Sequence, residues 1–175
     1  MRLLLTGVAG IGKTTVLRNA LDRLEGIRCS GFYTEERRHG GERVGFKIFT
    51  LDGREATLAW VDRVKGPRIG RYSVRVKEFE ALVLSQIDPE ETPADLYVID
   101  EIGNMELLSR RFRDKLVDLL ARPTHLLGSV AKKGRGFIDE IKRRNDVELI
   151  EVTKENRDQL PQELARRILK EIGAC

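Results

Sequence analysis

The chain has 175 residues, 41% hydrophobic and 34% charged, which is the length and composition of one globular domain and not of a disordered or repeat protein. Its 32 basic and 28 acidic residues give a net charge of +4 with the signs interspersed, a small excess that allows a nucleic-acid partner without requiring one. No apolar run reaches the roughly 20 residues of a membrane span, and no secretory signal is recognisable, so membrane insertion and secretion are not expected.

The cysteines and histidines of the sequence are few and scattered, which favours a reducing compartment. We expect one cytoplasmic domain over residues 1–175. Cys29 and Cys175 are far apart and outside any metal-binding spacing, so neither a disulfide framework nor a zinc site is predicted. His39 and His125 lack neighbouring metal ligands and are expected to be structural or surface residues. Many Glu, Lys and Arg beside few Asn and Gln are typical of thermophile proteins, which concerns stability rather than activity.

The N-terminal segment predicts a strand, a loop and a helix in that order. The apolar run at residues 3–6 is too short for a helix and ends at Gly7, which favours a buried strand followed by a tight turn. After Gly12, apolar residues recur with the helical period as far as Gly26, which is expected to stop the helix. These apolar residues are Val16, Leu17, Ala20, Leu21 and Leu24.

Residues 27–77 change to an alternation of apolar and polar side chains, which is typical of antiparallel β-hairpins. Gly40-Gly41 and Asp52-Gly53 mark the expected hairpin turns. We therefore predict a β-rich insertion on the sheet and not an independent domain.

The C-terminal half alternates strands with helices, which predicts a doubly wound α/β fold. Helical patterns are expected at residues 78–87, 110–121, 137–141 and 160–172, and strand patterns at 97–99, 126–130 and 147–150. The predicted architecture is a three-layer, mostly parallel sheet with helices on both faces and a β-hairpin insertion.

A phosphate-binding loop follows the first predicted strand. The pattern G-x-x-x-x-G-K-[ST] and the residue after it comprise Gly7, Val8, Ala9, Gly10, Ile11, Gly12, Lys13, Thr14 and Thr15. A loop at the positive end of a helix can direct backbone N–H groups at a polyphosphate, and its glycines let the backbone approach closely. Lys13 is predicted to reach the β and γ phosphates, while Thr14 is predicted to hold Mg²⁺.

An acidic pair ends the second buried strand, where ligands gather in open α/β sheets. This acidic strand segment comprises Leu96, Tyr97, Val98, Ile99, Asp100, Glu101, Ile102 and Gly103. Asp100 is predicted to hold the Mg²⁺ together with Thr14. Glu101 is predicted to orient and polarise the water that attacks the γ phosphorus, because a second carboxylate beside the metal ligand favours hydrolysis.

Four segments resemble one protein family: residues 7–15, 31–36, 100–107 and 152–157. Over nearly its whole length the chain is similar to the small nucleoside-triphosphatases known from thermophiles, which have a cancer-related human relative. The resemblance implies a P-loop fold of the RecA-like type and Mg²⁺-dependent hydrolysis of several nucleoside triphosphates to diphosphate and phosphate. Ala9 departs from a Pro often seen in the family's loop, which restores one N–H group and removes nothing essential.

Several further residues are weaker candidates for contacts with the nucleotide. A cation at the γ phosphate is expected to come from one of two clusters or, if turnover is slow, from a partner's arginine. The clusters are Arg110 and Arg111, and Lys132, Lys133 and Arg135. Residues 153–157 follow the last strand, where they either contact the nucleobase or form an ordinary turn and helix cap.

The prediction is thus a broad nucleoside-triphosphate phosphohydrolase acting on ATP, GTP, CTP and UTP with Mg²⁺. One alternative is a small kinase that transfers the γ phosphate to a nucleoside, nucleotide or nucleic-acid end. The other is a nucleotide-switched nucleic-acid-binding module that reads bases with the β insertion. Phe46, Phe49 and Trp60 would form its stacking platform, although their alternation favours packing within the β-ribbon core.

Overall fold

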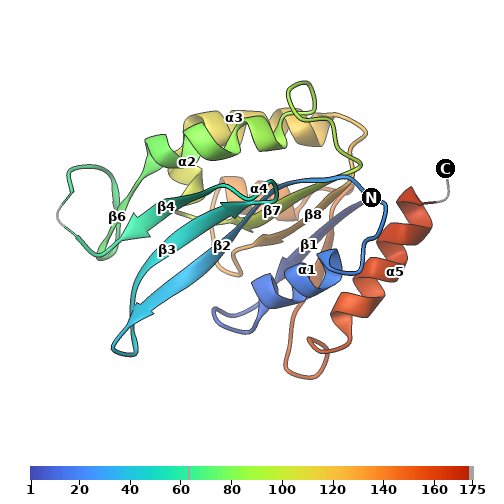
Figure 1. The fold of residues 1–175 in the computed structure, drawn as a ribbon, viewed down its shortest axis with the longest axis horizontal. Coiled ribbons are helices and arrows are strands. Elements are labelled where there is room, and N and C mark those ends of the chain that lie inside the picture. Colours follow the sequence, from blue (N-terminus) through green and yellow to red (C-terminus); the bar gives the residue numbers. More distant parts are fainter. Residues whose placement is uncertain (63, 174–175) are drawn as a thin grey trace.

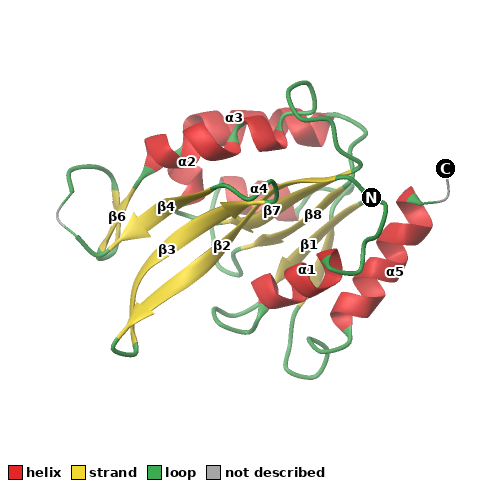
Figure 2. Cartoon of the chain, in the orientation of Figure 1, coloured by secondary structure: helices red, strands yellow, loops and turns green. Residues whose placement is uncertain are grey.

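The computed structural model describes residues 1–62 and 64–173, and these form a nine-stranded sheet between layers of helices (Figures 1 and 2). The strands are β1 (Arg2–Thr6), β2 (Cys29–His39), β3 (Glu42–Thr50), β4 (Glu55–Trp60), β5 (Arg68–Ile69), β6 (Tyr72–Val74), β7 (Leu96–Ile102), β8 (Leu126–Val130) and β9 (Glu148–Glu151). The α-helices are α1 (Lys13–Leu21), α2 (Val76–Val83), α3 (Arg110–Ala121), α4 (Phe137–Lys142) and α5 (Leu160–Ile172). Two short 3-10 turns, η1 (Ser85–Ile87) and η2 (Glu106–Leu108), follow α2 and β7.

Five strands form a parallel half of the sheet in the order β2-β7-β8-β1-β9. Strand β8 lies between β1 and β7, and Leu127 pairs with Leu3 on one side and with Val98 on the other. Since parallel strands end at the same edge of a sheet, the segments that follow β1, β7 and β8 are brought together there. This edge is where the phosphate loop and the acidic pair meet.

The β-rich segment continues this same sheet in antiparallel pairing. Strand β2 pairs with β7 at its start and then extends into a hairpin with β3, whose turn contains Gly40 and Gly41 with φ of 57° and 81°. The order β5-β6-β4-β3-β2 completes the sheet. The expected parallel arrangement therefore applies to the five strands that carry the site, while the insertion makes the whole sheet mixed.

Helices cover the two faces, which gives the expected three layers. Helices α1 and α5 pack on one face and α2, α3 and α4 on the other (Figure 1). Within β1 the alternation of a strand is visible, because Leu3 and Leu5 contact the α1 and α5 layer whereas Leu4 contacts the opposite layer. Both faces of β1 and β7 are thus buried, as their continuous apolar runs indicate.

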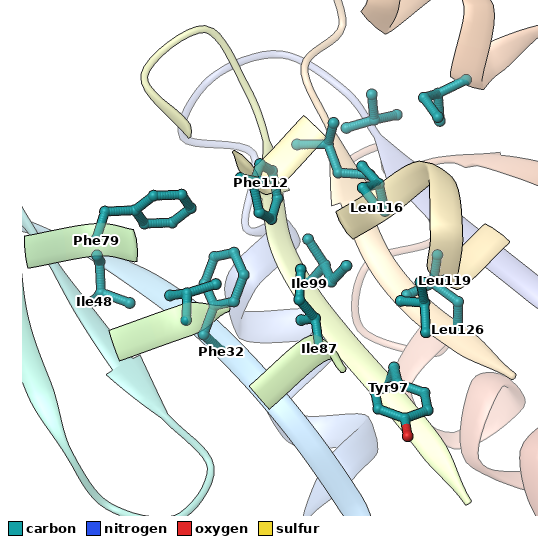
Figure 3. Close-up of a cluster of buried hydrophobic side chains, with 14 of the residues drawn as sticks. Phe32, Ile48, Phe79, Ile87, Tyr97, Ile99, Phe112, Leu116, Leu119 and Leu126 are labelled. Atoms are coloured by element: carbon teal, nitrogen blue, oxygen red, sulfur yellow. The ribbon is translucent and has the colours of Figure 1, made fainter. Parts of the chain in front are cut away.

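Three phenylalanines anchor the layer that contains α2 and α3 (Figure 3). Phe32 of β2, Phe79 of α2 and Phe112 of α3 make edge-to-face contacts with ring centroids 5.1–5.9 Å apart. Each ring is almost completely buried, and Ile99 of β7 belongs to the same cluster. This packing holds the end of β7 in a defined position relative to β2.

Two details of the prediction differ from the structure. The helix after the phosphate loop ends at Leu21 rather than continuing to Gly26, because the N–H groups of Arg23 and Leu24 bond to Ala20 and Leu21 in tight turns. The aromatic side chains of the insertion lie on different faces: Phe46 packs edge-to-face with Tyr72, whereas Phe49 stacks on Tyr33. Their spacing of three residues along β3 places them on opposite faces, and the register with β4 shifts between Phe46 and Lys47 because Leu58 is an extra residue there.

Across the two described ranges, no helix combines the length and apolarity that crossing a membrane would require.

Candidate functional site

The phosphate loop connects β1 to α1 in a conformation that depends on glycine. Gly12 directly precedes the helix with φ of 110°, a value that residues with side chains rarely adopt. At Gly7, an added Cβ would lie 2.8 Å from the carbonyl oxygen of Val152. The loop therefore curls tightly against the last strand and presents the positive, N-terminal end of α1 to its concave side.

Asp100 meets two hydroxyl groups at the carboxyl edge of the sheet. The Thr14 hydroxyl donates a 2.6 Å hydrogen bond to Asp100 Oδ2, and the Ser129 hydroxyl of β8 donates to Oδ1. The carboxyl is fully buried, which raises the pKa of Asp100 to about 6 despite both hydrogen bonds. Thr14 and Asp100 thus bring two oxygen donors together beside the phosphate loop. Ser129 was not expected here, since only strand order places β8 between β1 and β7.

Glu101 faces the phosphate loop through its lysine. Lys13 Nζ lies 3.3 Å from Glu101 Oε2 and 3.5 Å from the Gly7 carbonyl oxygen, to which it donates. The lysine side chain is 10% exposed and the glutamate side chain 30% exposed, so the pair lies at the floor of an accessible site. The structure therefore brings Lys13, Thr14, Asp100 and Glu101 to one place.

Glu106 adds a third carboxyl that sequence reasoning gave no role. It begins η2, is 5% exposed, and lies beside Gly103, where an added Cβ would be 2.8 Å from Glu106 Oε2 and 3.1 Å from Glu101 Oε1. Burial is the main cause that raises the pKa of Glu106 to about 8, and the nearby Glu101 and Asp100 carboxylates add to it. The sequence signal for this burial was the position of Glu106 between two apolar residues, Met105 and Leu107.

The high pKa of Glu106 predicts a stability change that can be measured. The folded state retains a proton that the unfolded chain, with a pKa near 4.5, releases, so this residue makes the protein less stable as pH rises from 4.5 to 8. Gln at this position does not titrate. We therefore expect the free energy of unfolding of Glu106→Gln to increase by roughly 3 kcal/mol relative to that of the native chain as the pH is raised from 5 to 7. Urea unfolding of both proteins at the two pH values measures it. If the two proteins differed in unfolding free energy by the same amount at pH 5 and at pH 7, Glu106 would be ionised in the folded protein.

A cavity of about 1150 Å³ opens above these residues. The phosphate loop, Glu101 and Glu106 line one part of it, and side chains of α1, β2, β3 and β4 line another. Of the acidic strand segment, Glu101 and Gly103 reach the cavity wall, while the preceding apolar residues of β7 are buried beneath it.

The two cationic clusters are placed very differently. Lys132 and Lys133, in the loop after β8, both line the cavity. Lys132 Nζ is 2.5 Å from Glu151 Oε1, whereas no ion pair involves Lys133 within residues 1–62 and 64–173. Arg110 and Arg111 have side chains 85% and 73% exposed on α3 and pair with acids of α3 and α2. Neither these two arginines nor Arg135 belongs to the described cavity lining.

The segment after β9 lies against the phosphate loop on its other side. Arg157 Nη1 donates to the Ile11 carbonyl oxygen at 3.4 Å, and a smaller cavity of about 300 Å³ lies between this segment and α1. Gly12, Thr15 and Asn19 contribute to that cavity. Asn156 has a structural part, because its Oδ1 accepts from the Thr153 N–H at 2.8 Å and its amide donates to the Glu151 carbonyl. Arg157 is thus the member of the segment that lines this cavity, with its guanidinium held between the Ile11 carbonyl and Asp158, whose Oδ1 is 3.8 Å away.

The remaining polar candidates lie outside the two cavities. His125 Nδ1 is 2.9 Å from the N-terminal amino group, and His39 is exposed at the β2–β3 turn. Burial raises the pKa of the Cys29 thiol to about 11, and Cys175 lies outside the described residues. No cluster of three or more His, Cys, Asp or Glu suited to a metal occurs in the described ranges. Thr14 and Asp100 are instead the kind of sparse oxygen set with which Mg²⁺ binds beside phosphates.

Comparisons with known proteins agree over most of the chain. A family model described as NTPase matches residues 2–165. The nucleoside-triphosphatase THEP1 of Thermotoga sp. (strain RQ2) is 40% identical over 164 residues, which cover 94% of this chain and 93% of that protein. The cancer-related nucleoside-triphosphatase of Homo sapiens is 41% identical over 171 residues, which cover 89% of this chain and 90% of that protein.

Two solved structures have the same fold. The crystal structure of THEP1 from the hyperthermophile Aquifex aeolicus aligns with a TM-score of 0.84 at 30% identity, covering 96% of this chain and 99% of that one. The solution structure of a human cancer-related nucleoside triphosphatase aligns with a TM-score of 0.80 at 37% identity and covers 97% of each chain. The likeness includes the β-rich segment, since the aligned part is nearly the whole chain.

Proposed function

Because this chain belongs to the NTPase family and is a nucleoside-triphosphatase, we propose that its phosphate loop and acidic strand end together bind and hydrolyse the triphosphate. The observation that carries this assignment is the meeting of Lys13, Thr14, Asp100 and Glu101 at one edge of the sheet. The loop amides and Lys13 receive the β and γ phosphates. The backbone N–H groups and the ammonium group already point at the position of the phosphates, so the protein needs little reorganisation to stabilise their negative charge during the reaction.

The proposed metal is Mg²⁺, held by Thr14 and Asp100. The donor set fits this ion, because both groups offer oxygen and the buried carboxylate has no cation of the chain bonded to it. When bound, Mg²⁺ supplies positive charge that offsets the charge developing on the phosphate oxygens. Ser129 keeps the Asp100 carboxylate oriented through its second oxygen.

Glu101 is proposed to position the attacking water. Without nucleotide its carboxylate pairs with Lys13, and an arriving polyphosphate attracts the same ammonium group. Transfer of Lys13 to the phosphates would release Glu101 to accept a hydrogen bond from water. Water then attacks the γ phosphorus, the bond to the bridging oxygen breaks, and Glu101 accepts the proton. Substrate binding would in this way complete the hydrolytic site.

Broad base use is proposed to follow from the smaller cavity beside α1. The Arg157 guanidinium can stack on the face of any nucleobase, an interaction that does not depend on the pattern of donors and acceptors at the base edge. ATP, GTP, CTP and UTP are therefore the proposed substrates. Nucleic acid is not required as a partner, and the cytoplasm is the proposed compartment because both cysteines are expected to be reduced thiols.

Phosphate release from these four nucleotides, with Mg²⁺ and with excess chelator, tests the proposal. We expect all four to be hydrolysed at rates within about tenfold of one another and only when Mg²⁺ is present, because the triphosphate and not the base makes the contacts that accelerate the reaction. Hydrolysis of one nucleotide alone would contradict the base assignment. Full activity in chelator would contradict the metal assignment.

Lys133 is the proposed cation at the γ phosphate. It lines the main cavity and is not engaged by any acid in the described ranges, whereas Lys132 is held by Glu151. We expect Lys133→Ala to lower kcat about 100-fold, a typical effect of removing one group that stabilises developing charge. Arg135→Ala is the matched control, since this residue of the same loop is not among the described lining residues. Equal kcat values in both variants would assign the cation elsewhere, for example to a partner's arginine.

A further inference from the structure

The main cavity extends well beyond the phosphate loop, onto the face of β2, β3 and β4. Thr34 and Glu36 lie two residues apart on β2 and so share one face of the sheet. In the register of the sheet, Glu36 pairs with Phe46, which in turn pairs with Ala59 beside Leu58. Met105 and Glu106 approach from the segment after β7. We call the part of the cavity lined by Thr34, Glu36, Phe46, Leu58, Met105 and Glu106 the distal arm.

The distal arm provides room that the nucleotide does not need. The main cavity, at about 1150 Å³, exceeds the roughly 300–1,000 Å³ typical of a site for one small ligand. The nucleobase is assigned to the smaller cavity near Arg157, on the side of the phosphate loop that faces β9. Only the phosphates then occupy the main cavity, and the distal arm begins where the γ phosphate would lie beside Glu101.

The distal arm has the chemistry of a site for a neutral molecule. Phe46 and Met105 are half-buried apolar side chains that pack against the core, and Leu58 is 1% exposed. Glu36 is paired with Arg43, so the charges of these two cavity-lining side chains offset each other, and Glu36 also pairs with Arg38 outside the described lining. Glu106 is only 5% exposed and has no ion pair in the described ranges. It carries a proton at neutral pH because burial raises its pKa to about 8.

These features favour a flat or apolar body that carries hydroxyl groups over an anionic one. The ring of Phe46, which also lies 5.5 Å from the Arg43 guanidinium, and the side chain of Met105 can contact the body above the buried Leu58. Thr34 and the protonated Glu106 can form hydrogen bonds with hydroxyl groups. A phosphate-bearing ligand would meet no unpaired cation among the side chains of the distal arm, since Arg43 at its edge is held by Glu36. A nucleoside fits this description, whereas a nucleotide or a nucleic-acid end does not.

We propose that the distal arm binds a neutral, hydroxyl-bearing molecule of nucleoside size and that the enzyme transfers the γ-phosphoryl group to its hydroxyl. The inference rests on the proposed function, because it uses the same phosphate loop and Glu101. The acceptor oxygen forms a bond to the γ phosphorus, and the bond from that phosphorus to the β–γ bridging oxygen breaks and releases the nucleoside diphosphate. The hydroxyl proton passes to Glu101, which is as able to take it from an alcohol as from water.

The test uses the full chain with Mg²⁺ and ATP labelled in its γ phosphate, with and without adenosine, cytidine or thymidine at millimolar concentration. We expect labelled nucleoside monophosphate to form and release of labelled inorganic phosphate to fall as the nucleoside displaces water. Nucleoside monophosphates and a 5′-hydroxyl oligonucleotide are expected to receive no label. The reaction without acceptor tests hydrolysis separately, so a failure of the proposed function is distinguishable. Normal hydrolysis with no labelled nucleoside, or preferential labelling of the anionic acceptors, would overturn the inference.

Substitutions locate the acceptor. Phe46→Ala is expected to raise the KM for the nucleoside about tenfold by removing a stacking surface. Phe49→Ala is the matched control, because this ring stacks on Tyr33 away from the distal arm. Since Phe46 also packs against Tyr72, Thr34→Val serves as a second variant that removes one hydroxyl, with an expected rise of about fivefold. Equal nucleoside KM values for Thr34→Val, the Phe49 variant and the native chain would place the acceptor elsewhere.

Discussion

Glu101→Gln is expected to bind a magnesium-bound nucleoside triphosphate at least as tightly as the native chain while its kcat falls about 1,000-fold. The amide has nearly the shape of the carboxylate but cannot accept the proton of the attacking water, and such general-base groups contribute about 10²–10⁴-fold. Binding is preserved because Glu101 makes no contact that holds the phosphates. Affinity is even expected to rise by up to about fivefold, since Lys13 no longer has to leave an ion pair with Glu101.

Two measurements separate these effects. Titration with a slowly hydrolysed triphosphate analogue gives the dissociation constant, and single-turnover phosphate release gives the chemical rate. Glu35→Gln is a matched control, because Glu35 also lines the main cavity but pairs with Arg18 at 2.6 Å rather than with the phosphate loop. We expect its kcat to stay within about twofold of the native value. Retention of full turnover in the Glu101 variant would contradict the role of Glu101 as the residue that positions water.

Local patterns were sufficient to predict most elements of the fold. The apolar runs of β1 and β7, the helical period of α3 and the Gly40-Gly41 turn all correspond to elements of the structure. Such signals act within a few residues, where the geometry of the backbone decides which side chains share a face. The phosphate loop was recognisable for the same reason, because its glycines and Lys13 lie within eight consecutive residues.

Features that depend on the order of the strands could not be predicted in this way. Ser129 bonds to Asp100 only because β8 lies between β1 and β7, a choice that no local pattern specifies. The position of Glu106 follows instead from the turn after β7, whose conformation brings its carboxyl next to Gly103 and has no signature among the turn residues of the sequence. The cationic candidates were indistinguishable in sequence, and position in the cavity lining and ion pairing separate Lys133 from Arg110 in the structure.

Lys13→Ala is expected to weaken binding of the magnesium-bound triphosphate about 100-fold and to lower kcat/KM about 1,000-fold or more. Its side chain is only 10% exposed at the floor of the site, where a charge acts more strongly on a phosphate than it does in bulk water. Removal also leaves the Glu101 carboxylate without its partner and facing the incoming negative charge, so the two effects add.

Lys13→Arg is an informative companion to this variant, because it retains the charge but not the compact shape of the ammonium group. We expect it to recover part of the binding and little of the kcat, since a guanidinium cannot occupy the narrow position 3.5 Å from the Gly7 carbonyl without moving the loop. Calorimetric titration with the triphosphate and with the diphosphate measures both variants. Because Lys13 is assigned to the γ phosphate as well as the β phosphate, its loss should weaken triphosphate binding more than diphosphate binding. Equal weakening for the two ligands would restrict its role to the β phosphate and would leave Lys133 as the cation that distinguishes the substrate from the product.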